Sequence, residues 1–148
     1  MKLITCSAVL SFVTKLEEET AKFYENLAEK YSEGRETFLS FSKDNRKNKT
    51  VVERAYYGVI SDALEACFSF GLNTGGLDSE AYSVRTEISK DASYKDALKT
   101  MIKIEETVQK AYTDAAALSE GLMADVPRAF KIMAKKRGER VARLRALV

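Results

Sequence analysis

The stretch KLEEETAKFYENLA, residues 15–28, returns in altered form as KIEETVQKAYTDAA, residues 103–116. Matching positions are 88 residues apart throughout, so Glu17 corresponds to Glu105 and Tyr24 to Tyr112. An internal duplication of this kind is typical of a symmetric bundle made of two helical hairpins. The repeated stretch therefore predicts an all-α fold.

Each copy places a carboxylate in the middle of an otherwise apolar helical stripe. Around Glu17 the stripe contains Val13, Thr20 and Tyr24, spaced by three or four residues. Seven residues make about two helical turns, so each tyrosine lies below its glutamate on the same face. A carboxylate in such a place is costly unless it is paired, protonated or bound to a metal. The duplication thus indicates a buried polar site built from both halves of the chain.

The same apolar spacing, continued along the chain, predicts four long helices. They are expected at 7–33, from 36 to about 70, at 93–119, and from about 127 to the end. Ser7 and Ser93 are expected as N-caps, and Gly34 is expected to end the first helix as a C′ glycine. Pro127 suits the first position of the last helix. The polar stretch 43–49 leaves room for a break in the second helix.

The second and third helices are joined by a long crossover. Residues 71–76 are the strongest break in the chain, and Asp78 or Ser79 can cap a short extra helix over 80–90. We see no run of four to eight residues that alternates cleanly, so no strand is expected. The prediction is one domain over residues 1–148, with two helical hairpins joined by a crossover that contains an extra short helix.

Composition further limits the class of protein and its location in the cell. Hydrophobic residues make up 45% and charged residues 31% of the 148 residues, with a formal net charge of +2, as in ordinary soluble domains. Lys2 and the uncharged run 3–14 could begin a signal peptide, but no small-residue cleavage site follows. No run reaches the ~20 apolar residues that span a bilayer. We expect a cytoplasmic protein without a membrane partner.

Several site chemistries are excluded by what the sequence lacks. Cys6 and Cys67 form no C-x-x-C pair, which excludes a thiolate metal site, and we expect two buried thiols rather than a disulfide. Nucleophilic triads fail because the chain has no histidine base. Residues 73–76 lack the lysine and hydroxyl residue of a phosphate-binding loop. No catalytic residue is predicted.

The repeated motifs resemble the rubrerythrin-type branch of the ferritin-like superfamily. That family's first and third helices read Glu-x5-Phe/Tyr-Tyr, which residues 17–24 follow and residues 105–112 follow except at Ala111, where the family has an aromatic residue. Its second and fourth helices open with Phe-x2-Leu-Ala, which Phe38 and Phe130 begin in degenerate form. The matched ranges are about 9–49 and 97–144. The resemblance implies a ferritin-like four-helix bundle that holds two iron or manganese ions between its helices.

The chain departs from that family where the metal would bind. The family's Glu-x-x-His pairs begin seven residues after each opening phenylalanine. The corresponding residues here are Asn45, Asn48, Arg137 and Arg140. Of the implied ligands only Glu17 and Glu105 remain. Arginine stays protonated in proteins and offers no lone pair to a cation.

We therefore predict that Arg137 and Arg140 stand where the metals would be. Two carboxylates and two guanidinium groups sum to zero charge, and the planar arginine fork matches carboxylates in a bidentate manner. The expected members of this core ionic network are Glu17, Glu105, Arg137, Arg140, Asn45 and Asn48, with Tyr24 and Tyr112 beside them. The two tyrosines are expected to pack in the core with a hydroxyl hydrogen bond.

Three functions follow from these readings. The first is a non-catalytic structural or interaction module without a cofactor, acting as a homodimer through the apolar stretch 51–70. The alternative is a residual diiron-type oxidoreductase or peroxide-handling protein, in which Glu17 and Glu105 bind iron or manganese. The weakest is an adaptor for nucleic acid that uses the C-terminal segment 128–148.

That C-terminal segment carries eight basic residues and one acid, Glu139. Such a charge excess is typical of surfaces that bind nucleic acid or acidic partners. However, the first helix and the turn after it carry seven acids between Glu17 and Glu36, and we expect these acids to lie nearby and neutralise the segment. The segment also lacks aromatic residues beyond Phe130. A nucleic-acid partner is therefore not expected.

Overall fold

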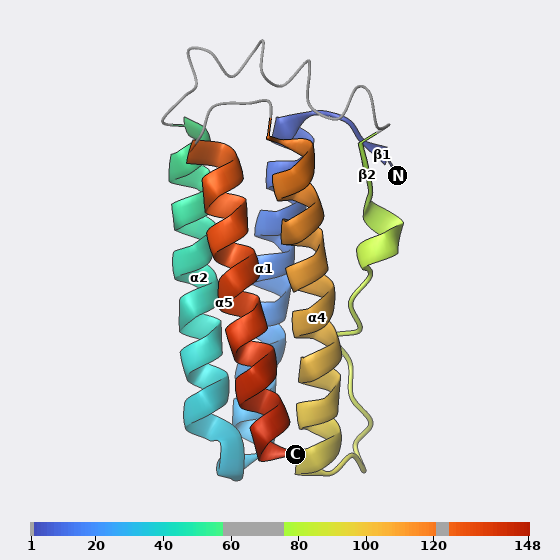
Figure 1. The fold of residues 1–148 in the computed structure, drawn as a ribbon. Coiled ribbons are helices and arrows are strands. Elements are labelled where there is room, and N and C mark those ends of the chain that lie inside the picture. The colour runs from blue at the N-terminus through green and yellow to red at the C-terminus, as the bar shows by residue number, and fades with distance from the viewer. Residues whose placement is uncertain (1, 58–75, 121–124) are drawn as a thin grey trace.

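The computed structural model describes residues 2–57, 76–120 and 125–148. Within these ranges the regular structure is helical apart from two strands of two residues each. The long helices are α1 (Cys6–Lys30), α2 (Arg35–Tyr57), α4 (Tyr94–Leu118) and α5 (Asp125–Leu147). They lie side by side around a common hydrophobic core (Figure 1). The predicted all-α fold class is confirmed.

The four helices form two antiparallel hairpins. α1 packs most closely on α2, and α4 on α5, while smaller contacts join α2 to α5 and α1 to α4. Along the chain in Figure 1, α1 runs downward, α2 and α4 run upward, and α5 runs downward. Because α2 and α4 point the same way, the chain has to return along the bundle between them. The described part of this crossover, residues 76–93, runs along the outside of α4 (Figure 1).

The predicted apolar stripe of α1 is buried, but the ends of the helix differ from the prediction. The N-cap is Thr5 rather than Ser7, because the Thr5 hydroxyl accepts the backbone N–H of Ala8 at 3.0 Å. The helix ends at Lys30, three residues earlier than predicted. A short 3-10 turn then leads directly into α2.

Gly34, in that turn, does not act as a C′ glycine. Among the described residues only Gly76 has a positive φ, so left-handed backbone is not the reason for glycine at position 34. The reason is space. A Cβ at Gly34 would lie 2.6 Å from Cε1 of Tyr94 and 2.7 Å from Cζ of Phe38. The turn from α1 to α2 therefore passes directly against two aromatic rings.

Gly34→Ala is expected to lower the free energy of unfolding by about 1–3 kcal/mol, the usual cost of overpacking. The ring of Phe38 is fully buried and its centroid lies 6.0 Å from that of Tyr94, so neither ring can move aside freely. Urea denaturation would measure the change. Gly138→Ala in α5 is the control, since its Cβ would meet only the flexible end of Gln109. Equal losses in both variants would contradict this account.

α2 is continuous, so the break allowed for at 43–49 does not occur. Asn45 and Asn48 are buried, and their side-chain amides form hydrogen bonds with side chains of neighbouring helices. These amides are therefore not free to bond to nearby backbone groups in place of the helical hydrogen bonds. Of the apolar stretch 51–70, residues 58–70 lie outside the described ranges. Val52 is buried, whereas Val51 and Tyr57 are exposed.

The extra helix predicted over 80–90 is absent. A 3-10 turn covers Ser79–Tyr82, capped by Asp78 as predicted, and residues 83–88 have no regular structure. Tyr82, Val84, Thr86 and Ile88 are less exposed than the residues between them, which is the two-residue period of an extended chain. Three of these four are β-branched, a residue type that favours extended backbone. The sequence reading overlooked this alternation.

Two further local predictions need correction. Strands β1 (Lys2–Leu3) and β2 (Leu77–Asp78) pair antiparallel, although no strand was expected. Pro127 is the third residue of α5 rather than its first. Proline is tolerated there because the N–H groups of a first turn have no partner within the helix.

The predicted cap of α4 is confirmed. The Ser93 hydroxyl accepts the N–H of Asp96 at 3.1 Å, and the Asp96 carboxylate accepts the N–H of Ser93 at 3.0 Å, which together form a capping box. Near the other end of the crossover, the Tyr82 hydroxyl donates to the Asp114 carboxylate of α4 at 2.6 Å. The bond from Tyr82 attaches the crossover to α4, and the hydroxyl of Tyr31, just after α1, donates to the carbonyl oxygen of Ala92 near its end.

Cys6 is buried, and Cys67 lies outside the described residues. Across the described ranges, no helix combines the length and the apolar character needed to cross a bilayer.

Candidate functional site

Polar side chains from all four long helices meet in the core of the bundle. α1 and α4 contribute the duplicated glutamate and tyrosine, α2 contributes the asparagines, and α5 contributes the arginines. The buried set is Glu17, Tyr24, Asn45, Asn48, Glu105, Tyr112, Arg137 and Arg140. Arg137 is 0% exposed and Arg140 only 7%. The side chains predicted from the sequence are thus all in the interior.

Arg137 lies between the two glutamates. Its Nη2 donates to Oε1 of Glu17 at 2.6 Å, and its Nη1 donates to Oε2 of Glu105 at 2.7 Å. Both are short charge-assisted hydrogen bonds between groups that are fully buried. A single guanidinium therefore bridges the carboxylates of α1 and α4.

Arg140 lies about one turn further along α5 and forms a hydrogen bond with only one of the two glutamates, Glu105. Its Nη1 donates to Oε1 of Glu105 at 3.0 Å and to Oδ1 of Asn45. Its Nη2 donates to the carbonyl oxygen of Phe41 at 3.3 Å, and its guanidinium carbon lies 4.6 Å from the centroid of the Phe41 ring. Glu105 consequently has two arginine partners, whereas Glu17 has one.

The two asparagines have different roles. Nδ2 of Asn45 donates to the Thr20 hydroxyl at 2.8 Å, so this residue links Arg140 to α1. No described hydrogen bond joins Asn48 to the arginines or glutamates of the network. Its Oδ1 accepts from Lys136 at a long 3.5 Å, at the seam between α2 and α5. The structure thus brings Asn45 into the ionic network and leaves Asn48 beside it.

The tyrosines donate across the duplication. The Tyr24 hydroxyl donates to Oε1 of Glu105, and the Tyr112 hydroxyl donates to Oε1 of Glu17, each at 2.9 Å. This exchange follows from the directions of the two helices. Because α1 and α4 are antiparallel, the tyrosine two turns along one helix lies level with the glutamate of the other. Each tyrosine therefore serves the glutamate of the other copy.

The pKa shifts show which protonation states the site stabilises. Burial, together with the Glu105 carboxylate, raises the pKa of Tyr24 well above its usual value, and burial with Glu17 does the same for Tyr112. Burial alone would raise the pKa of Glu105, but Arg137 and Arg140 outweigh it and lower this pKa. Burial likewise opposes the charge of Arg137, yet the two carboxylates raise its pKa further. At neutral pH the phenols are donors, Glu105 is an anion and Arg137 is a cation.

Acid should weaken the fold through Glu105. Because its pKa is lower in the folded than in the unfolded chain, its stabilisation is present above the ordinary value of 4.5 and is lost as pH falls through the lower, folded value. Glu105→Gln should have a lower stability at neutral pH and a flatter dependence on acid. Urea midpoints taken between about pH 7 and about pH 3 would measure both curves. Parallel curves for the two proteins would contradict the assignment.

The donor set does not fit an iron or manganese site. Both oxygens of Glu105 and Oε1 of Glu17 already accept hydrogen bonds from guanidinium or phenol groups. Oε2 of Glu17 is the one carboxylate oxygen of the pair without a described donor. A cation bound there would also lie close to the charge of Arg137. No group of three or more histidine, cysteine or acidic residues in the described ranges could hold a metal ion.

The three described cavities lie away from the network. The largest described cavity, about 880 Å³, lies between crossover residues 83–92 and the outer side of α4. A second, of about 680 Å³, follows the outer side of α2, and a third, of about 360 Å³, lies between α1 and the crossover. No member of the network lines any of these three.

Comparison with known proteins found no matching family model, no matching curated protein and no matching solved structure.

Proposed function

We propose that this protein is a ferritin-like bundle in which arginine has replaced the dinuclear metal centre, and that it acts as a non-catalytic structural or interaction module. One observation carries the proposal: the guanidinium of Arg137 bridges the buried carboxylates of Glu17 and Glu105. In the rubrerythrin-type resemblance these are the two glutamates that would face the metals. Arginine side chains of the protein thus supply the positive charge that metal ions would supply in that family.

The chemistry of the network also favours a structural role. Its charges are balanced, its phenols are held protonated, and its members are buried. A general acid or base needs a pKa near the working pH and access to its substrate. The arginines move the pKa of Glu105 away from neutrality instead. The network therefore fixes how the four helices pack rather than moving protons.

The predicted homodimer belongs to the same proposal. Exposed Val51 and Tyr57 on α2 support a contact there, since large apolar side chains are common at the centre of subunit interfaces. Sedimentation equilibrium giving the mass of a single chain would overturn this part.

Metal loading tests the proposal. Protein stripped with a chelator and incubated with Fe²⁺, Mn²⁺ or Zn²⁺ should retain well under one ion per chain after gel filtration. The matched variant carries Asn45→Glu, Asn48→His, Arg137→Glu and Arg140→His, which together rebuild both Glu-x-x-His pairs. This variant should load iron or manganese if the ferritin-like register holds.

Stoichiometric binding by the unchanged protein would overturn the proposal and favour the alternative of a residual metal-dependent oxidoreductase. Failure of the rebuilt variant to load, while it remains helical, would count against the ferritin-like register.

A further inference from the structure

Charge is divided unevenly over the surface of the bundle. Outside the core network, α1 and α4 carry seven basic and seven acidic residues. α2 and α5 carry twelve basic and only five acidic residues. These acids are Glu36, Asp44, Glu53, Asp125 and Glu139. Since α2 and α5 are neighbours, their outer surfaces form one side of the bundle (Figure 1).

Most of these cations have no acidic partner within the described ranges. Arg46 pairs with Glu18 and Glu25, Lys131 with Glu120, and Arg145 with Glu106. The other nine form no ion pair with any residue in the described part of the chain. They are Arg35, Lys43, Lys47, Lys49, Arg54, Arg128, Lys135, Lys136 and Arg143. We call these nine residues the basic face.

Outside the core, the acids of the first helix form no described ion pair with the C-terminal segment 128–148, contrary to the expectation from the sequence. α5 packs on α4 and α2, and α1 is not one of its main neighbours. Apart from the core pair of Arg137 with Glu17, no ion pair among the described residues joins α5 to α1. The positive charge of α5 outside the core is therefore not paired with the acids of α1.

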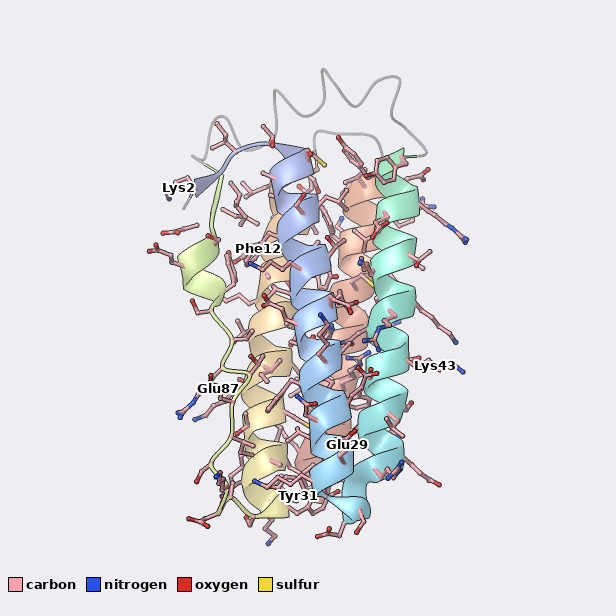
Figure 2. All side chains as sticks on the ribbon, turned by 180° about the vertical axis from the view of Figure 1, so that it is seen from behind. Lys2, Phe12, Glu29, Tyr31, Lys43 and Glu87 are labelled. Carbon is pink, nitrogen blue, oxygen red and sulfur yellow. The ribbon has the colours of Figure 1, made fainter. Side chains whose placement is uncertain are left out.

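The cations of the basic face extend along both helices. On α2, Lys43, Lys47 and Arg54 lie on one stripe with a rise of roughly 16 Å, while Arg35 and Lys49 lie about a quarter turn or more away from that stripe. On α5 the cations run from Arg128 to Arg143, a rise of roughly 22 Å. Lys43 points away from the bundle into solvent (Figure 2). The cavity of about 680 Å³ along α2 is lined in part by basic-face residues of that helix. Two neighbouring groups of cations thus extend along part of α2 and most of α5.

We infer that the basic face binds the phosphate backbone of a nucleic-acid duplex. A duplex presents about one negative charge per 1.7 Å, and binding to it is driven by counterion release without any need for aromatic contacts. An anionic membrane would require a continuous apolar surface beside the charges. On the outer side of α2, Leu39 and Val51 line the same cavity as basic side chains, so the apolar area there is interrupted by charge. The inference rests on the proposed interaction role and names its partner.

Fluorescence anisotropy with a labelled 30-base-pair duplex of mixed sequence tests the inference. The unchanged protein should bind at about 50 mM salt, with affinity falling steeply as salt rises. The variant Lys43→Glu/Lys47→Glu should bind at least about 10-fold more weakly, with a salt slope smaller by about two. The control Lys99→Glu/Lys103→Glu changes two exposed lysines of α4 with the same spacing and charge. It should stay within about twofold of the unchanged protein.

Equal losses in the two variants, or no binding at low salt, would overturn the inference. Competition by polyglutamate as effective as that by unlabelled duplex would also overturn it, in favour of an acidic protein partner. The metal-loading result separates this test from the proposed function. If the protein binds neither duplex nor metal, only the inference about the basic face is contradicted. If it binds metal and still binds duplex, only the proposal of a metal-free core is contradicted.

Discussion

Arg137→Ala is expected to lower the free energy of unfolding by about 3–5 kcal/mol, because it leaves two buried carboxylates without their shared cation. The substitution removes both short hydrogen bonds that tie α5 to α1 and α4. It also opens space in the core, since Arg137 is among the largest fully buried side chains. Chemical denaturation followed by circular dichroism would measure the loss, and calorimetry would show a lower Tm.

The matched control for Arg137→Ala is Arg145→Ala. Arg145 lies on the same helix and also pairs with a glutamate of α4, Glu106, at the same 2.7 Å distance as Arg137 with Glu105. Its side chain is 64% exposed, however, and exposed pairs contribute about 1 kcal/mol or less. Similar losses for the two arginines would mean that burial of Arg137 contributes nothing.

Glu105→Ala is expected to have the second large effect, again about 3–5 kcal/mol. The substitution removes the partner of two guanidinium groups and of the Tyr24 hydroxyl. Arg137 would keep only Glu17, and Arg140 would keep only the neutral oxygens of Asn45 and Phe41. Two cations would then share one anion in a region that excludes water.

Glu17→Ala is the comparison for Glu105→Ala, because the two residues occupy matching positions of the duplication. Glu17 has a single arginine partner, and its Oε2 has no described donor. Denaturation curves of the two variants should therefore show the greater loss for Glu105→Ala. A greater loss for Glu17→Ala would contradict the asymmetric network described above.

The stripes of the four long helices were predictable because apolar and polar residues repeat at helical spacing over more than twenty residues. The polar members of those stripes were predictable for the same reason. Glu17 and Glu105 could be placed inside by period alone, and Arg137 and Arg140 by period together with the register of the family that the chain resembles. Long periodic segments carry enough information to override weak local preferences such as that of Asn45 for non-helical backbone.

Short segments were predicted less well because their structure depends on distant residues. Gly34 has the position of a C′ glycine in sequence, but its role comes from the rings of Phe38 and Tyr94. Residues 80–90 have the composition of a helix, yet the chain crosses the length of the bundle there and lies extended. The alternation of Tyr82, Val84 and Ile88 was the signal for this, and it is weak because only a few residues carry it.

Details of the site were harder to obtain from the sequence. The exchange of tyrosines between the two copies depends on α1 and α4 being antiparallel, which becomes visible only when the direction of the crossover is known. The contribution of Thr20 through Asn45, and that of Phe41 through its carbonyl and ring, depend on side-chain positions. Helical period places a residue on a face, but it does not choose among several hydrogen-bond partners.

The most direct test of the central claim is a crystal structure of the protein soaked in Mn²⁺, with anomalous data collected at a wavelength where manganese scatters strongly. We expect the planar guanidinium of Arg137 within hydrogen-bonding distance of both Glu17 and Glu105, and no anomalous peak between them. An anomalous peak between the two carboxylates, with Arg137 displaced toward solvent, would contradict the account.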